Sequence, residues 1–403
     1  MNKKISLGLA IALIIVSATA TFAIAMSVSQ RMYNKLITDL PNRAQMYDAV
    51  EEIDKLVRSK YYGEIDEAVL DSNLENGYIN GLNDPYSYYM NADAHKLYSS
   101  KLEGRSAGIG VEVETDPESG YLLVTEVYPN SPAQTEGLKK GDRIVAIDGE
   151  TVTVDNAVEM TGKLSGVKLT SVSITYRRDD VDKSVNVVLG YTNQTVSYEL
   201  IGTTGYIKIS AFYKNTVDQL EKAVTQLKKD GAKSLIFDVR STYDGTIEYT
   251  CSVIDYLVPT ATDGNKAIAT LVNKNGETVK TYSSEAKDIT MPMAVLVDSD
   301  TAGYGELFAC DLRDFGKAFL IGEKTAGRAA VQETFELSDG GAVVLTTSKM
   351  LPYISESFDG EGLTPDNEVF LPGALKDNLS TLEREKDTQL QAALSMLADN
   401  SAE

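Results

Sequence analysis

The sequence is poor in the residues on which many hydrolases depend, with one histidine, His95, and two cysteines, Cys251 and Cys310, among 403 residues. A Ser-His-Asp or Cys-His site would have to use His95, which stands in a polar helical stretch far along the chain from any candidate nucleophile. A histidine-based zinc site is excluded as well, since the cysteines lack ligand spacing with His95. We therefore expect no metal and no cofactor. The cysteines could pair in an exported chain or remain buried thiols, and we favour the thiols.

Positive charge is also scarce. The chain has 38 Lys and Arg against 59 Asp and Glu, a formal net charge of -21. Binding to nucleic acid needs clustered basic residues, so we expect no nucleic-acid partner. Hydrophobic residues make up 43% of the sequence and charged residues 24%, so the chain can bury a core, and its length allows two or three domains.

Charge is absent from residues 5–26, "ISLGLAIALIIVSATATFAIAM", which follow Lys3 and Lys4. This run can span a bilayer, and the two lysines favour a cytoplasmic N-terminus. Its small residues between Ala18 and Ala25 also suit a signal-peptidase site, and a buried core helix is a third alternative. We expect residues 1–29 to be an uncleaved signal anchor of a single-pass cell-membrane protein, with the bulk of the chain extracytoplasmic.

The rest of the chain changes character three times. Residues 30–102 have helical periodicity, with apolar residues at Met46, Val50, Ile53, Leu56 and Val57. Residues 103–192 contain short alternating strands separated by turn residues, which indicates a β-rich domain. Residues 193–375 alternate between strands and helices, typical of an α/β domain with partly parallel strands. Residues 376–403 follow, with one amphipathic helix expected from Asp377 to Leu397. The predicted fold class is α/β multidomain.

Five segments, in order, carry a family resemblance: "DPYSYYM", "GIGVEVE…VYPNSPAQTEGLKKGDRIVAIDGETV", "GYIKISAFYKNT", "GRAAVQ" and "GEGLTPDNEV". From about residue 45 to its end, the chain resembles the C-terminal processing peptidases (tail-specific proteases), which are exported serine peptidases. The second segment resembles their PDZ domain and the last three resemble their catalytic core. The resemblance implies a serine nucleophile in the elbow between a strand and a helix, with a lysine as its base.

Both catalytic positions are substituted here. Aligning "TAGYGE" with the elbow places Gly303 at the nucleophile, and aligning "GRAAVQ" with the second segment places Arg328 at the lysine. The interval between them matches the family spacing, and Gln332 and Asp314 also match family positions. Glycine has no side chain that could attack a carbonyl, and arginine keeps its proton at ordinary pH. No catalytic pair is intact.

A third departure concerns the loop that lends backbone N–H groups to the oxyanion hole. The family has a "DLRNNPGG"-type sequence there, and this chain has "DVRSTYDG". Asp244 replaces the first of the paired glycines, before Gly245, and Tyr243 replaces the proline. A carboxylate near a developing oxyanion opposes catalysis. We expect Asp244 or a peptide's terminal carboxylate to pair with Arg328.

Thr301 is the alternative nucleophile. A threonine hydroxyl needs an adjacent base, and the nearest lysines, Lys317 and Lys324, do not align with the family base. We expect Asp300 and Thr301 to cap the following helix instead. An acid pair of Glu306 and Glu323 is disfavoured, because both carboxylates are expected to be exposed.

The PDZ-like domain offers a second candidate site. In PDZ domains an exposed strand edge takes up an extended peptide, and backbone N–H groups hold its carboxylate. The corresponding residues are Gly108, Ile109, Gly110 and Val111, with Ile109 lining the pocket. The alternative interpretation of this segment is a tight turn into a strand.

Three functional hypotheses follow. The first is a proteolytically inactive homologue that binds peptides or unfolded protein C-termini as a scaffold, or regulates an active family relative. The second is an active serine-type peptidase that uses Thr301. The third is a purely structural protein, assembled through its terminal helices.

Overall fold

The computed structural model describes residues 40–399, together with residues 16, 17, 19, 21, 22 and 26. Short gaps in the described range fall at residues 105, 117–118, 129–130, 155, 193, 260–266, 285–287, 377–378 and 380–381. The chain divides into two units, Met1–Asn73 and Leu74–Glu403, each of which has its own contacts. The expected membrane segment, residues 5–26, lies almost wholly outside the described residues. Within the described part of the chain, no helix has the length and apolar composition needed to cross a bilayer.

The first unit contains α2 (Leu40–Lys60) and the beginning of α3 (Glu67–Asn80). The helix predicted from apolar periodicity is confirmed as α2. Arg58 joins the two helices through an ion pair with Glu67, at 2.6 Å between Nη1 and Oε1. Ile53 and Leu56 remain mostly exposed.

The β-rich domain at residues 106–192 contains two sheets. The larger has the order β3-β4-β5-β8-β9, with β6 paired to β5, and the smaller has the order β10-β2-β7. Their side chains enclose a core that includes Ile109, Val124, Ile144 and Ile174. The strands are β2 (Ser106–Gly108), β3 (Val111–Thr115), β4 (Leu122–Val127), β5 (Arg143–Ile147), β6 (Glu150–Thr151), β7 (Ser165–Val167), β8 (Ser171–Arg178), β9 (Val181–Val188) and β10 (Tyr191–Thr192); the helices are α5 (Pro132–Thr135) and α6 (Ala157–Lys163).

The α/β core contains a six-stranded sheet of order β11-β12-β13-β16-β17-β20. All its neighbouring strands are parallel except β11 and β12, which bears out the predicted partly parallel sheet. The strands are β11 (Val196–Ile201), β12 (Thr204–Ile209), β13 (Ser234–Asp238), β16 (Met293–Val297), β17 (Ala318–Gly322) and β20 (Asn367–Glu368); the helices are α7 (Thr216–Lys229), α8 (Ile247–Leu257), α9 (Tyr304–Asp314), α10 (Gly373–Lys376) and α11 (Thr388–Asp399).

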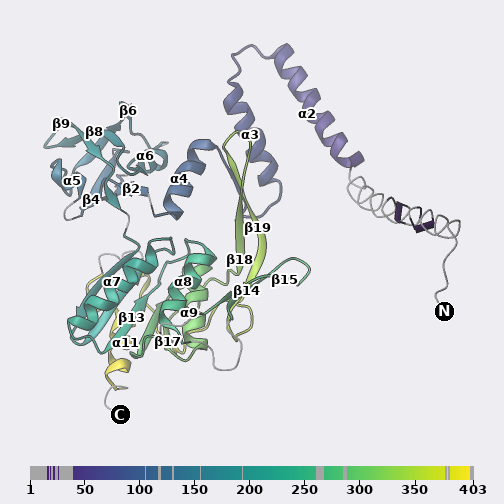
Figure 1. Ribbon diagram of the computed structural model, residues 1–403. Helices are drawn as coiled ribbons and strands as arrows, with labels where there is room; N and C mark the ends of the chain where they lie inside the picture. Colours follow the sequence, from purple (N-terminus) through teal and green to yellow (C-terminus); the bar gives the residue numbers. More distant parts are fainter. Residues whose placement is uncertain are drawn as a thin grey trace, which may run out of the picture. The chain divides into compact units, whose positions relative to one another are not determined.

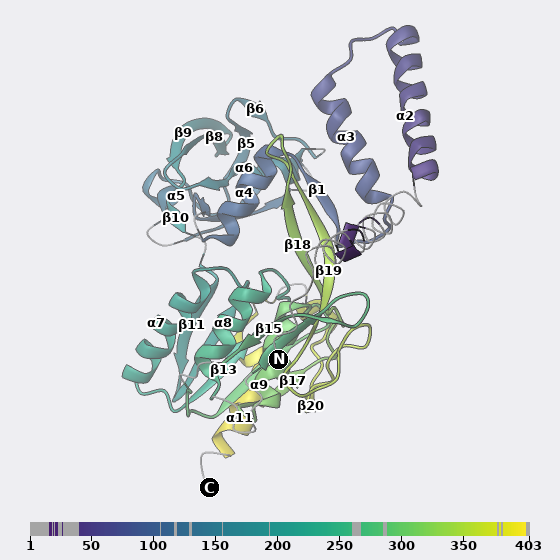
Figure 2. The ribbon, with the colours of Figure 1, turned by 45° about the vertical axis from the view of Figure 1, so that its right-hand side comes forward.

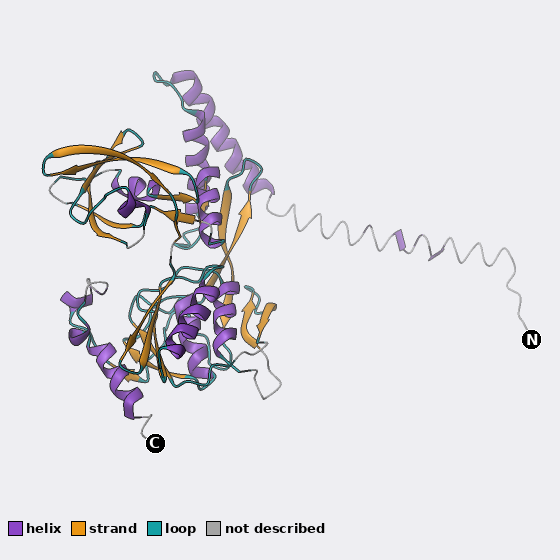
Figure 3. Ribbon diagram, turned by 60° about the vertical axis from the view of Figure 1, so that its left-hand side comes forward, coloured by secondary structure: helices purple, strands orange, loops and turns teal. Residues whose placement is uncertain are grey.

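Helices cover both faces of this sheet. Alternate residues of the buried strands point to opposite sides. Phe237 and Val295 therefore join the cluster formed with α7, α8 and α9, whereas Ile236 and Leu296 join Leu390 of α11. Figures 1 and 3 show the three helices on one face and α11 on the other. Both faces are buried, as the apolar run "MAVLV" of β16 requires.

A second sheet brings the N-terminal part of this unit onto the core. It has the order β1-β19-β14-β15, with β18 paired to β19, and Figure 2 shows β1 beside the long β18–β19 hairpin. Tyr88 of β1 pairs with Val344 of β19. The strands are β1 (Tyr88–Met90), β14 (Ala267–Val272), β15 (Thr278–Ser283), β18 (Ala330–Glu336) and β19 (Ala342–Leu351). The region predicted as purely helical, residues 30–102, therefore also contains a strand, between α3 and α4 (Ala92–Leu102).

The C-terminal helix is shorter than expected. It was predicted to run from Asp377 to Leu397, but α11 begins at Thr388 after a short 3-10 turn, Arg384–Lys386. Asp387 starts the helix because its carboxylate accepts a hydrogen bond from Leu390 N at 3.0 Å and its carbonyl accepts one from Gln391 N.

The same carboxylate attaches α11 to the sheet through Arg240, which is 4% exposed. Arg240 Nη2 lies 2.6 Å from Asp238 Oδ2 and 2.8 Å from Asp387 Oδ2. Burial disfavours the charge of Asp238, but Arg240 outweighs this effect and holds the pKa of the carboxyl group below its usual value. The three charges therefore form one buried, paired cluster.

Replacing Arg240→Ala should lower the free energy of unfolding by about 3–5 kcal/mol, because two buried carboxylates lose their partner. Urea denaturation measures this loss. Arg384→Ala removes an ion pair with Glu199 that is largely exposed, and it should cost less than about 1 kcal/mol.

The loss should also depend on pH. Because the folded pKa of Asp238 is depressed, its contribution is complete above the unfolded value of about 3.9 and is lost as the pH falls through the folded value. The difference in free energy of unfolding between wild type and Arg240→Ala should therefore become smaller in acid. Equal losses for the Arg240 and Arg384 variants at neutral pH would contradict the role given to Arg240.

Candidate active site

The elbow between β16 and α9 has the geometry of a nucleophile turn but carries glycine at its tip. Gly303 has φ 58° and ψ -108° and precedes the first residue of α9. This conformation strains any residue with a side chain. A Cβ atom at Gly303 would nevertheless have room, because its nearest neighbours, Arg328 O and Tyr243 O, would lie 3.7 and 3.8 Å away. The space for a nucleophile is present and no side chain fills it.

Glu306 fastens this elbow to the segment before β18. It is 0% exposed, and its carboxylate accepts hydrogen bonds from Gly303 N and Arg328 N, both at 2.8 Å, and from Gly327 N at 2.6 Å. The Thr325 hydroxyl also donates to it. The expectation that Glu306 and Glu323 are exposed is wrong, since Glu323 is 6% exposed. Three amide donors replace the water that Glu306 loses on burial.

Thr301 is sequestered beneath the elbow. It is 0% exposed, and its hydroxyl lies 3.0 Å from Val239 O and 2.9 Å from Asp298 Oδ1. Asp298 N donates to the hydroxyl oxygen at 3.0 Å. The prediction that Asp300 and Thr301 cap α9 is wrong, because Gly303 occupies the cap position and Glu306 satisfies its N–H. A buried hydroxyl with these partners is not presented to a substrate.

Arg328 does not pair with Asp244, contrary to expectation. Its guanidinium lies 3.9 Å from the ring centroid of Tyr86 and donates from Nη2 to Gln332 Oε1 at 3.0 Å. Asp244 instead accepts hydrogen bonds from Lys101 Nζ at 2.6 Å and from the Tyr213 hydroxyl at 2.5 Å. Tyr86, just before β1, and Lys101 of α4 thus supply partners that the core sequence alone could not reveal.

The loop that carries Asp244 is held on both sides. Ala302 N donates to Thr242 O at 3.1 Å, and Phe212 N donates to Asp244 O at 2.9 Å. Gly245 has φ 145°, and a Cβ atom there would lie 2.6 Å from Phe212 O. The backbone of the loop is fixed next to the elbow, with the Asp244 carboxylate on it.

A cavity of about 500 Å³ lies over these elements. Arg328 and Lys101 contribute positive charge and Asp244 contributes negative charge. Burial raises the pKa of Tyr88, Tyr98 and Tyr304, so these phenols keep their protons at ordinary pH. The other lining residues are Pro85, Tyr86, Leu102, Tyr243, Gly245, Thr246, Ile247, Gln332, Thr334 and Val344. The cavity therefore brings together Arg328, Gln332, Asp244 and Gly245 from the predicted site and adds a tyrosine-rich wall, with Gly303 close to Arg328 and Thr301 buried beneath the elbow.

Comparison with known proteins gives this arrangement a family. The family model for peptidase family S41 matches residues 203–369, and the PDZ domain model matches residues 107–189. The carboxy-terminal processing protease CtpA of Bacillus subtilis is 30% identical over 336 residues, which make up 82% of this chain and 70% of that protein. The chain belongs to peptidase family S41. The resemblance to the C-terminal processing peptidases is confirmed.

Two further proteins are similar to this chain. A Staphylococcus aureus protein named "Probable CtpA-like serine protease" is 28% identical over 356 residues, covering 87% of this chain and 70% of that protein. A solved structure from Bacteroides fragilis assigned to the S41 proteases has a TM-score of 0.52 and 18% identity, over 80% of this chain and 90% of that one. This last likeness concerns the fold alone.

The PDZ domain uses part of its expected peptide loop for its own packing. Ile109 is 1% exposed in the domain core, and its N–H donates to Leu164 O at 3.1 Å. Gly110 has φ 83° and accepts a hydrogen bond from Tyr128 N. Gly108 pairs with Ser165 and Tyr191, while Val111 begins the edge strand β3. Peptide binding at this segment stays a prediction, but one of its N–H groups is already used.

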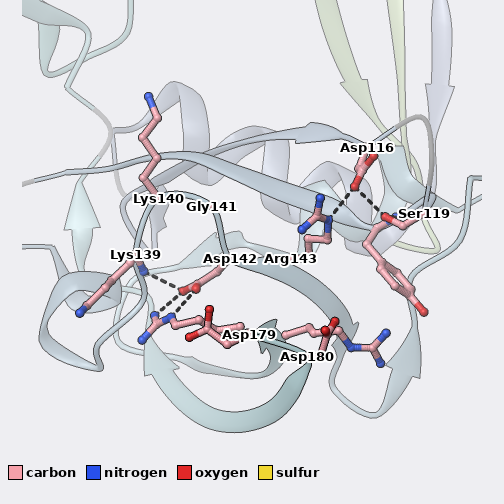
Figure 4. Close-up of a pocket in the computed structure, with 12 residues that line it drawn as sticks. Asp116, Ser119, Lys139, Lys140, Gly141, Asp142, Arg143, Asp179 and Asp180 are labelled. Atoms are coloured by element: carbon pink, nitrogen blue, oxygen red, sulfur yellow. Dashed lines mark hydrogen bonds and ion pairs between the residues drawn. The ribbon is translucent and has the colours of Figure 1, made fainter.

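A second cavity in the PDZ domain, of about 660 Å³, is lined by charged residues that pair with one another. Arg178 binds Asp142 at 2.6 Å and Arg143 binds Asp116 at 2.7 Å, as the dashed lines in Figure 4 show. These pairs join the turns around β4, β5 and β8. These ion pairs stabilise the domain, and none of the residues that line this cavity belongs to the predicted peptidase site.

The cysteines and the histidine have structural positions. Cys251 and Cys310 are free and buried, so the preference for thiols is confirmed. Burial raises the pKa of Cys310 to about 12 and raises that of Cys251 as well, which keeps both thiols protonated. His95 Nδ1 lies 3.0 Å from Gly340 O, next to the β18–β19 hairpin.

Gly303→Ala should lower the free energy of unfolding by about 1–3 kcal/mol, because alanine must adopt the strained backbone of the elbow. Urea denaturation is the measurement. Gly162→Ala is the matched control, since Gly162 lies in α6 with open space around it and without a positive φ, and it should cost nothing. A Gly303 variant as stable as wild type would mean that the elbow relaxes.

Proposed function

We propose that this chain is a non-cutting member of peptidase family S41 that binds peptides or unfolded protein C-termini, as a scaffold or as a regulator of an active relative. The observation that carries the proposal is glycine at the tip of the elbow. An acyl transfer begins with attack by a side-chain oxygen or sulfur, and Gly303 has neither.

The chemistry around Gly303 supports the same conclusion. A Ser/Lys pair needs a base that can lose its proton, whereas the guanidinium of Arg328 stays charged and stacks on Tyr86. Asp244 adds a carboxylate to the loop where a negative oxyanion would form. Thr301, the alternative nucleophile, is buried and hydrogen-bonded to Asp298, which disfavours an active peptidase built on it.

Surfaces on which a peptide could lie support the proposal. The elbow, the cavity and the PDZ domain all persist around the substituted positions. A relative of this chain carries the name carboxy-terminal processing protease, and we infer that the ligands here are likewise chain termini. A protein that binds C-termini without cutting them needs a binding surface but no nucleophile.

The membrane anchor belongs to the proposal too. Residues 5–26 carry no charge and follow two lysines, so we infer a single pass with residues from 30 onward outside the cytoplasm. The full chain should fractionate with membranes after alkaline washing, and a variant without residues 1–29 should be released. Equal release of both forms would remove the anchor from the proposal.

The decisive experiment incubates the full chain with an unfolded protein and with peptides that have apolar C-termini, and follows both by mass spectrometry. We expect binding without cleavage. Cleavage that disappears in Thr301→Ala would identify a rewired peptidase and overturn the proposal. If cleavage persists in Thr301→Ala and co-purifies with the protein, the chain uses a different nucleophile, and the proposal is overturned as well.

A triple variant supplies the positive control. Gly303→Ser, Arg328→Lys and Asp244→Gly together provide a nucleophile, a base and an unobstructed oxyanion loop, and we expect turnover to appear. Gly303→Ser alone should stay inactive, since its hydroxyl has no base. Turnover by Gly303→Ser alone, above the level of wild type, would contradict this assignment of roles.

A further inference from the structure

We propose that the cavity over the elbow is a receptor for a peptide's free C-terminal carboxylate, with Arg328 as the group that binds it. The proposal rests on the proposed function, since a peptide can be held there only if it is not cut. It assigns carboxylate binding to Arg328, the position that aligns with the lysine base of the family.

Arg328 is held ready for a planar anion. Tyr86 covers one face of the guanidinium, and Gln332 accepts a hydrogen bond from Nη2. Gln332 is itself fixed, because its Nε2 donates to Thr346 Oγ1 at 3.2 Å. A guanidinium carries five N–H donors in one plane, and the bond to Gln332 uses one of them. The remaining donors suit the two oxygens of a carboxylate.

No acidic side chain in the described part of the chain forms an ion pair with Arg328. Asp244, the acid that lines the cavity, is bound by Lys101 and Tyr213. Asp84 lies close enough to interact electrostatically, but its oxygens accept from Tyr86 N and from the Ser87 hydroxyl. Among the described residues, the guanidinium of Arg328 therefore has Asp84 as a charged neighbour but makes no direct ion pair. Although the chain has a net charge of -21, the guanidinium of Arg328 can attract an anion locally.

The walls indicate which carboxylate fits. Tyr88, Tyr98, Tyr304 and Val344 surround the charged groups with aromatic and aliphatic surface. A pocket of about 500 Å³ is in the range of small-ligand sites, in which apolar walls surround a few orienting polar groups. The last residue of a chain, with an apolar side chain and a free carboxylate, matches both features. Tyr304 also begins α9, whose N-terminal end favours negative charge.

The PDZ loop is the other place where a carboxylate could bind. There, Ile109 N is already bonded to Leu164 O, so this N–H is not available to a carboxylate. An internal Asp or Glu side chain has the same chemistry as a terminal carboxylate, so the experiment must separate the two sources as well as the two sites.

The test compares one N-terminally labelled, uncharged decapeptide ending in phenylalanine in two forms, with a free or an amidated C-terminus. A third peptide is amidated and has one internal glutamate. Binding to the full chain is measured by fluorescence polarisation, and every sample is checked for cleavage by mass spectrometry. The variants are Arg328→Ala, Arg328→Lys and Gln332→Ala. Arg384→Ala is the control, since it removes an arginine that is paired with Glu199 and does not line the cavity.

We expect the free acid to bind about 10- to 100-fold more tightly than either amide, the range of a charge-assisted hydrogen bond to one carboxylate. Arg328→Ala should abolish this preference. Arg328→Lys should keep part of it, because lysine retains the charge without the planar fork. Gln332→Ala should reduce it, and Arg384→Ala should leave it unchanged. Thermal unfolding of each variant shows whether it is folded.

Other results overturn the inference. Equal binding of all three peptides would refute the carboxylate receptor and leave the non-cutting peptide binder intact. A preference that survives in folded Arg328→Ala would place the carboxylate elsewhere, with the PDZ loop as the next site. Preference for the internal glutamate peptide would identify a side-chain receptor in its place. Cleavage of any peptide by wild type would instead refute the proposed function.

Discussion

The buried carboxylate of Glu306 is the interaction on which the site depends. Its oxygens collect the N–H groups of Gly303, Gly327 and Arg328, so one side chain fixes the elbow and the segment that faces it. A charge removed from water is stable only when several donors surround it. The backbone geometry of the elbow therefore depends on Glu306 and not on the side chain present at position 303.

The cavity is assembled from segments that are distant in sequence. The β16–α9 elbow and the loop after β13 contribute Tyr304 and Asp244, and the segment that leads into β18 contributes Arg328. The segment before β1 adds Tyr86, and α4 adds Lys101. The pairing of β1 with β19 brings this N-terminal segment to the cavity, where Tyr86 covers the Arg328 guanidinium.

Much of this could be predicted from the sequence. The alternation of strands and helices predicted the partly parallel sheet, and the order of the motifs predicted the family of C-terminal processing peptidases. The assignment of Gly303 and Arg328 to the catalytic positions stays a prediction. The partners of those positions could not be predicted, because they come through tertiary pairing of β1 with β19. "DPYSYYM" carried only family resemblance, and no spacing linked Tyr86 to Arg328. The exposure of Glu306 was predicted wrongly, because a glutamate three residues into a helix is usually exposed and its burial here depends on the N–H donors of residues 327 and 328. The C-terminal helix begins later than predicted, because Asp387 caps it at Thr388 while its carboxylate also binds Arg240.

The mutual adjustment of the elbow, Arg328 and Asp244 has a consequence for substitutions at these positions. A serine at position 303 alone would have to adopt the strained backbone of the turn, and no base would be present to activate its hydroxyl. A lysine at 328 would give up the planar stack on Tyr86, and a glycine at 244 would leave Lys101 without its partner. Each of these three single substitutions therefore carries a structural cost before the other two are present. The three positions are coupled, so a change at any one of them would be tolerated better when the other two change with it.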